Sequence, residues 1–325
     1  MCNNAGYSKV IMSNQQRKPD PRLAAFLFAN NLLKSKFYDV RLSPAVNRFN
    51  TELGSRLAGG LTEKVFGAVD IDIAPQLEVR LYRPSAKIDL PVIIYYHGGG
   101  WVVGSIDSHD NICRKLANRA SAIVIAVGYR LAPENKFPSA VEDAYTALQW
   151  AHTNARSFGG RPDRIAVCGD SAVGNLAAVT CLVSRDMKGP NIAFQALVYP
   201  ATDASNLDTE SYRLSGRGYY LTKPVIQQVI PLYVNSGNEV LNPYVSPLLA
   251  SDLGGLPPAL VVTAEFDPLL SEGEAYVAKL AASGVPCRLH RYAGMIHGFL
   301  SFGGFIHQSN RAIGEIAAAI TEAVM

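Results

Sequence analysis

The residues with the clearest chemical signature surround Ser171. The apolar run Ile165–Cys168 is typical of a buried strand, and the stretch Gly169–Ser171 separates it from a helical pattern that begins at Ala172. A serine at such a strand-to-helix corner is held in a strained turn with its hydroxyl exposed, and the adjoining helix N-terminus favours developing negative charge. The pattern predicts a nucleophilic serine, although an ordinary N-cap serine would give the same local pattern.

Two further groups that suit this chemistry also follow strand-like runs. Asp267 comes after the run through Val262, and His297 comes after the segment 287–292. In an open parallel sheet, reactive groups lie at the C-terminal ends of the strands. We therefore expect Ser171 to attack an acyl carbonyl, His297 to act as general base and Asp267 to orient the imidazole.

A third strand-like run, Val92–Tyr96, is followed by His97, three glycines and Trp101. Three consecutive glycines leave the backbone N–H groups unshielded, so we expect the amides of Gly99, Gly100 and Ala172 to bind the oxyanion. Trp101 and Tyr219 are candidates for lining the substrate pocket, and a role as core aromatics is the equal alternative.

The elements that position these groups follow from hydrophobic periodicity. Strict alternation over 69–73 and 77–82 predicts two half-exposed strands. Continuous apolar runs predict strands buried on both faces of a parallel sheet. These runs are Val92–Tyr96, Ala122–Val127, Ile165–Cys168, Ala196–Tyr199 and Ala259–Val262. The helical patterns between and after them are Asn111–Ala120, Ala140–Ala155, Ala172–Asp186, Glu272–Ala282 and Arg311–Val324. Alternating strands and helices predict an α/β fold with a doubly wound sheet.

Two segments stand outside this alternation. Pro21 and Pro44 each begin a helical pattern near the N-terminus, with Leu33 in the apolar stripe of the first and Gly59 at the end of the second. We assign residues 1–50 to N-terminal cap helices and 203–241 to a cap insertion. The catalytic core then comprises 51–202 and 242–325.

Composition excludes several classes of protein. The chain has 325 residues and a formal net charge of +3, which is too small and dispersed to indicate nucleic acid as a partner. No apolar run reaches the roughly 18 residues that span a bilayer, so we expect no stable membrane association. The five cysteines form no CxxC motif or Cys/His cluster, so no metal site is expected. These features, with no signal-like segment at the start, predict a cytoplasmic protein.

The chain resembles the hormone-sensitive-lipase-like branch of the α/β-hydrolase esterases, also called bacterial family IV. The matching stretches are His97–Trp101, Tyr129–Glu134, Phe137–Ala144, Gly169–Ala172, Ser246–Ala250, Asp267–Leu269 and His297–Phe299. The resemblance implies an α/β-hydrolase fold, with an eight-stranded, mostly parallel sheet and a helical cap. It also implies hydrolysis of short- to medium-chain carboxylic esters without a cofactor. Homodimers are common in similar proteins, and this chain leaves the question open.

Departures from the family pattern keep other functions open. Val173 stands where the family has glycine, so we expect a trimmed neighbour, a displaced serine or an impaired homologue that only binds small molecules. If the serine is displaced, Val173→Gly raises kcat or shifts the chain-length preference. Ser271 replaces a common aspartate, which leaves Asp267 as the preferred acid and Glu272 as a distant second. An amidase, a lactonase or a carbamate hydrolase would use the same triad.

Several other side chains receive structural assignments. We expect His97 to shape the glycine turn, Cys168 to fill buried space and Arg130 to form an ion pair with Glu134 behind the site. The remaining histidines are expected to face solvent, namely His109, His152, His290 and His307.

Overall fold

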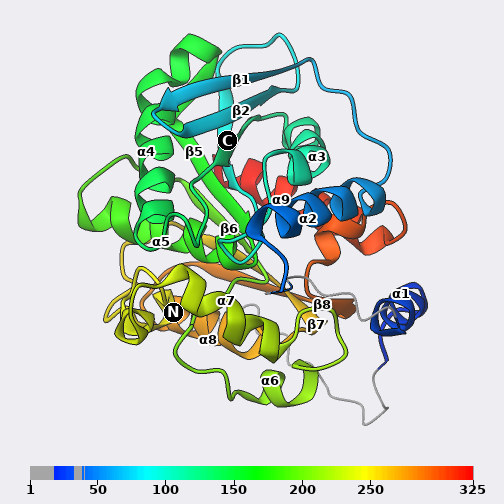
Figure 1. Cartoon of the computed structure of the whole chain (residues 1–325). Coiled ribbons are helices and arrows are strands. Elements are labelled where there is room, and N and C mark those ends of the chain that lie inside the picture. Colours follow the sequence, from blue (N-terminus) through cyan, green and yellow to red (C-terminus); the bar gives the residue numbers. More distant parts are fainter. Residues whose placement is uncertain (1–17, 33–38, 40, 325) are drawn as a thin grey trace, which may run out of the picture.

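The computed structural model describes residues 18–32, 39 and 41–324. In this part of the chain, eight strands form one sheet in the order β1-β2-β4-β3-β5-β6-β7-β8 (Figure 1). Their bounds are Gly67–Ala74 (β1), Leu77–Arg83 (β2), Leu90–Tyr96 (β3), Ile123–Gly128 (β4), Gly160–Asp170 (β5), Phe194–Val198 (β6), Ala259–Phe266 (β7) and Cys287–Ile296 (β8). β2 is antiparallel to β1 and β4, and every other pairing is parallel. The predicted α/β-hydrolase architecture with a mostly parallel eight-stranded sheet is confirmed.

Helices cover both faces of the sheet. They are Pro21–Leu32 (α1), Pro44–Ala58 (α2), Asp110–Ala120 (α3), Ser139–Asn154 (α4), Ala172–Asp186 (α5), Glu210–Ser215 (α6), Lys223–Tyr233 (α7), Leu270–Ala282 (α8) and His307–Val324 (α9). Short 3-10 turns occupy Asp107–His109 (η1), Ala155–Phe158 (η2), Gly237–Leu241 (η3), Pro247–Leu249 (η4) and Phe299–Phe302 (η5). One core cluster joins α4, α5 and α8 to the sheet, and the other joins α3 and α9 to its opposite face.

The second N-terminal helix begins and ends as predicted, but it crosses a predicted domain boundary. Ser43 caps α2 by accepting a hydrogen bond from the Val46 amide at 3.3 Å, as the Ser-Pro signal predicts. The helix continues to Ala58, so the domain boundary predicted at residue 50 falls inside α2 and has to move beyond it. Leu33, predicted on the apolar stripe of the first helix, lies outside the described residues. The rest of the domain division stays a prediction.

Strand register brings the chemical groups together. β7 and β8 are paired so that Phe266 lies opposite Ile296, and the residues that follow them are Asp267 and His297. β3 and β5 are paired so that Tyr96 lies opposite Gly169. The glycine loop and the Ser171 corner therefore leave the sheet side by side.

Among the described residues, no helix has the combination of length and apolar character needed to cross a membrane.

Candidate active site

Ser171 occupies a sharp turn between β5 and α5. Its φ of 63° and ψ of −132° lie outside the ordinary regions for a non-glycine residue, as a nucleophile elbow requires. This strained conformation is stabilised by a hydrogen bond of 2.8 Å, which the Ser171 amide donates to the Val198 carbonyl. Gly169 makes the turn sterically accessible, because a Cβ at this position would lie 2.3 Å from the Val173 carbonyl oxygen.

The structure brings Ser171, His297 and Asp267 into one hydrogen-bonded chain. The distance between Ser171 Oγ and His297 Nε2 is 2.7 Å, and that between His297 Nδ1 and Asp267 Oδ2 is also 2.7 Å. All three side chains are buried, so bulk water does not compete for these hydrogen bonds. The arrangement has the geometry of a nucleophile, a base and an orienting acid.

Asp267 has two hydrogen-bonding roles. Its Oδ1 accepts from the Leu269 amide at 2.8 Å, just before α8, while Oδ2 faces His297. Glu272 Oε1 instead accepts from the Thr202 amide at 2.8 Å, so the structure places Asp267 and not Glu272 against the imidazole. Burial holds the pKa of Glu272 well above its usual range.

Backbone amides next to Ser171 are free to receive a ligand oxygen. Within the described part of the chain, no residue accepts a hydrogen bond from the amides of Gly99, Gly100 or Ala172. Gly99 and Gly100 have φ values of 136° and 63°, which explains why side chains are absent there. The Gly99 carbonyl accepts from the Val103 amide at 2.9 Å and closes the loop.

His97 has the structural place expected for it. Its ring stacks on Tyr129 with centroids 4.4 Å apart, and its Nδ1 lies 3.1 Å from the Gly98 carbonyl. Burial, assisted by the nearby His109, lowers the pKa of His97 to about 3, so the ring is neutral at ordinary pH. A neutral Nδ1–H donates to Gly98 and supports the glycine turn.

Val173 does not displace the serine. Its side chain is fully buried in the core cluster, and Ser171 still lies within hydrogen-bonding distance of His297. The close approach falls one residue later, because a Cβ on Gly174 would lie 3.0 Å from Pro200 Cβ. The tight packing of α5 against the loop after β6 therefore uses Gly174.

Ser171 lies at the meeting point of two cavities of different character. The first is mainly apolar, and its lining includes Trp101, Leu207, Leu221, Val225, Val229 and Leu269. The second is more polar and lies beneath the N-terminal helices, with His297, Gly99, Asn47, Asn50, Thr51 and Asp170 among its lining residues. α7 thus borders one cavity, and α1 and α2 border the other.

Comparison with known proteins identifies the family. Residues 93–301 match a family model described as alpha/beta hydrolase fold. The chain is 42% identical over 258 residues to a carboxylic ester hydrolase of Mycobacterium tuberculosis, LipN, covering 76% of this chain and 68% of that protein. It is also 42% identical over 228 residues to an arylesterase of Saccharolobus solfataricus, covering 69% of this chain and 73% of that protein. An esterase structure from Pyrobaculum calidifontis superposes with a TM-score of 0.87 at 40% identity, covering 94% of this chain and 100% of that chain.

The chain belongs to the α/β-hydrolase family. Its relatives also confirm the resemblance to the hormone-sensitive-lipase-like esterases.

The two aromatic residues predicted for the substrate pocket of this hydrolase have different positions. Trp101 lines the apolar cavity and stacks on Tyr233 with ring centroids 4.2 Å apart. Tyr219 is not among the described residues that line either cavity, and its ring stacks on Phe266, 5.1 Å away. The next residue, Tyr220, lines the polar cavity instead. Stacking of its ring on Phe266 of β7 favours the alternative of a core aromatic for Tyr219.

The predicted ion pair between Arg130 and Glu134 was wrong. Arg130 lies 2.8 Å from Asp143 on α4, and Glu134 lies 2.6 Å from Arg48 on α2. Arg48 was missed by the sequence analysis, although its Nε donates to the Val102 carbonyl at 3.0 Å and so joins α2 to the loop after the glycines. No local pattern signals this contact, since its partners lie more than 50 residues away.

His109 was predicted to face solvent and is buried. Its Nε2 lies 3.4 Å from Asp170, the residue before the nucleophile. The burial of His109 therefore goes with a contact to a residue that is distant in the sequence. His152 and His307 are exposed, as expected, and His290 is half-buried beside Glu315. Cys168 is buried on β5, as expected of a space-filling residue.

The site offers no cluster of metal ligands. Among the described residues, no group of three His, Cys, Asp or Glu side chains is arranged to hold a metal ion.

Proposed function

We propose that this hydrolase is a serine carboxylesterase that cleaves small carboxylic esters through an acyl-enzyme formed on Ser171. The observation that carries the proposal is the continuous chain of 2.7 Å contacts from Ser171 through His297 to Asp267. The carboxylic ester hydrolases and esterases among its relatives support the choice of an ester as substrate.

Each step of the reaction has a residue to perform it. Ser171 Oγ bonds to the carbonyl carbon while its proton passes to His297 Nε2, and Asp267 stabilises the imidazolium that forms. Collapse of the tetrahedral intermediate breaks the ester C–O bond, and the departing alcohol takes the proton from His297. A water molecule then attacks the acyl-enzyme with His297 again as base, which releases the carboxylic acid and restores the Ser171 hydroxyl.

The oxyanion would accept hydrogen bonds from the amides of Gly99, Gly100 and Ala172. These groups have no acceptor in the described part of the protein and sit beside the serine, which supports the assignment. In comparable sites, losing one such donor lowers kcat by roughly 10²–10³-fold.

The two cavities suit different parts of the substrate. We assign the acyl chain to the apolar cavity, where Trp101, Val225 and Val229 provide apolar surface. We assign the leaving alcohol and the incoming water to the polar cavity, whose lining includes His297. This division favours esters of short- to medium-chain acids.

A cytoplasmic location and a homodimer remain predictions.

The proposal is tested with p-nitrophenyl butyrate and an active-site-directed fluorophosphonate. Ser171→Ala is expected to lower kcat by about 10⁴-fold or more and to abolish labelling, because the nucleophile is absent. Ser157→Ala, which changes an exposed serine on η2, is the matched control and keeps full activity. Full turnover by a correctly folded Ser171→Ala variant would remove the serine from the mechanism.

Kinetics on the ester and the amide of one acyl group decide between an esterase and an amidase. We expect the ester to be cleaved and the amide to be a poor substrate. Preferential cleavage of the amide would overturn the assignment of substrate class.

A further inference from the structure

Asp170, directly before Ser171, is a buried acid whose Oδ1 accepts two hydrogen bonds and lies close to an imidazole. The Gly98 amide donates to it at 2.9 Å, and the Tyr95 hydroxyl also donates to it at 2.9 Å. His109 Nε2 lies 3.4 Å from the same oxygen. This carboxylate takes no part in the proton transfers proposed above, yet it joins the nucleophile elbow to the first residue of the glycine loop.

The contact between Asp170 and Gly98 leaves no room for a side chain at position 98. A Cβ on Gly98 would lie 2.4 Å from Asp170 Oδ2 and 3.1 Å from the Asp170 carbonyl oxygen. The other end of the loop is closed by the bond from the Val103 amide to the Gly99 carbonyl. The amides of Gly99 and Gly100 lie between these two fixed points, so the position of Asp170 determines how they face Ser171.

His109 is itself held by a rigid turn. Its Nδ1 lies 2.8 Å from Ser108 Oγ, and Ser108 Oγ donates to the Ser105 carbonyl at 2.8 Å. These contacts fix the imidazole of His109 with its Nε2 toward Asp170.

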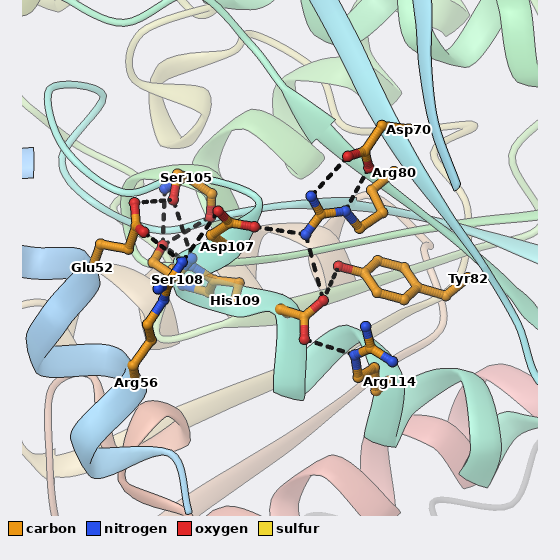
Figure 2. A network of polar contacts seen from close by, with 11 residues as sticks. Glu52, Arg56, Asp70, Arg80, Tyr82, Ser105, Asp107, Ser108, His109 and Arg114 are labelled. Atoms are coloured by element: carbon orange, nitrogen blue, oxygen red, sulfur yellow. Dashed lines mark hydrogen bonds and ion pairs between the residues drawn. The ribbon is translucent and has the colours of Figure 1, made fainter. Parts of the chain in front are cut away.

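Charged contacts from neighbouring elements fix the turn that carries His109, as Figure 2 shows. Asp107 accepts from Arg80 of β2 at 2.6 Å and from Arg56 of α2 at 3.3 Å. Ser105 donates to Glu52 of α2 at 3.4 Å. The turn is therefore anchored to both β2 and α2.

Asp170 retains its charge despite its burial. Burial raises the pKa of this carboxyl, but His109, Tyr95 and the Gly98 amide more than offset the effect, so the pKa lies below its usual value. A buried charge that loses a partner is strongly unfavourable, which makes the pair sensitive to substitution of either residue.

We infer that Asp170 and His109 are positioning residues that hold the oxyanion-binding amides of Gly99 and Gly100 at a fixed distance from Ser171. The inference rests on the proposed function, because it concerns the transition state of the same reaction. A misplacement of about 1 Å in such a site lowers the rate by roughly a hundredfold. Both residues line the polar cavity, and neither lines the apolar cavity assigned to the acyl chain. Because the oxyanion forms only in the transition state, the loss should fall on kcat more than on KM.

The test measures active-site-titrated kcat and KM for p-nitrophenyl butyrate, together with the Ki of an alkyl trifluoromethyl ketone. The ketone forms a tetrahedral adduct whose oxyanion needs the same amides. We expect Asp170→Ala to lower kcat by about 10–100-fold, with a matching rise in Ki and little change in KM. Asp170→Asn keeps an acceptor for Gly98 and should retain more activity, and His109→Asn should lie between Asp170→Asn and Asp170→Ala.

Two matched controls change exposed residues of the same types. Asp163→Asn alters an acid on β5 that pairs with Arg161, and His152→Asn alters a histidine on α4. Both should leave kcat and Ki unchanged. If Asp170→Ala fails to fold, Asp170→Asn and His109→Asn still give the two measurements.

The inference is overturned if the Asp170 and His109 variants lose only active-site titre while the remaining sites keep the wild-type kcat and Ki. It is also overturned if KM rises and kcat does not fall. Failure of the proposed function would look different, because the wild-type enzyme itself would then show no Ser171-dependent ester hydrolysis.

Discussion

Replacing Val173 with glycine restores the residue that the family has at this position. From the sequence alone, the change was expected to raise kcat by returning a displaced serine to its place. The structure removes the reason for that expectation, because Ser171 Oγ already lies 2.7 Å from His297 Nε2 with Val173 present. We therefore predict that Val173→Gly leaves kcat close to the wild-type value and lowers stability instead.

The size of the loss follows from the surroundings of Val173. The side chain is 0% exposed, and full burial of a valine contributes roughly 1.5–3 kcal/mol. Position 173 is also inside α5, where glycine is less favourable than alanine by about 0.5–1 kcal/mol. Val173→Gly should lower the free energy of unfolding by about 2–4 kcal/mol, and Val173→Ala should lose only the packing part.

Urea unfolding followed by far-UV circular dichroism measures the loss, and turnover of p-nitrophenyl butyrate per titrated active site measures kcat. The alanine variant separates the packing effect from the backbone effect. A Val173→Gly variant with wild-type stability would refute the packing argument. A large rise in kcat would show that valine does hold the serine away from its best position.

Three further changes test other parts of the structure. Gly169→Ala should abolish the activity of any protein that folds, because the new Cβ would lie 2.3 Å from the Val173 carbonyl oxygen. Near-normal turnover would show that the elbow can relax. Burial raises the pKa of Glu272 above the usual 4.5, so above pH 4.5 the folded protein keeps a proton on this carboxyl that the unfolded chain loses. The free energy of unfolding therefore falls as the pH rises above 4.5, by up to about 1.4 kcal/mol per pH unit. Glu272→Gln should flatten this slope in urea unfolding at pH values from about 5 to 8, and parallel curves for the two proteins would contradict the assignment. Burial also raises the pKa of the three buried thiols, which are Cys113, Cys168 and Cys181. At about pH 8 iodoacetamide should therefore label them only after unfolding, and peptide mass mapping can check this. Labelling of these residues in the native protein would contradict their burial.

The sequence predicted the elements whose signals are local. Strands buried on both faces of the sheet carry continuous apolar runs, so β3 to β7 could be located from hydrophobicity alone. The helix after the elbow was predicted over Ala172–Asp186, and α5 has the same bounds. The convergence of Ser171, Asp267 and His297 could also be predicted, because parallel strands present their C-terminal ends at one edge.

The partners of the charged residues could not be predicted in this way. Arg130 and Glu134 are four residues apart, a spacing that pairs side chains only on a helix, and no helix forms there. Their actual partners come from α4 and α2. His109 was misplaced for the same reason, since its burial depends on an acid 61 positions further along the chain.

The glycine loop is held by contacts of unequal strength, and these differ in how much they fix its position. α2 reaches the loop through Arg48 and the Val102 carbonyl, and the partner of Arg48, Glu134, has a side chain that is 52% exposed. An exposed ion pair of this kind contributes about 0–1 kcal/mol, so it adds little to the attachment of α2 to the loop. The contacts of Asp170 with Gly98 and Tyr95 are buried, and they are costly to break. The oxyanion-binding amides are therefore held chiefly by Asp170 at the end of β5, and α2 contributes through its contacts with the turn that carries His109.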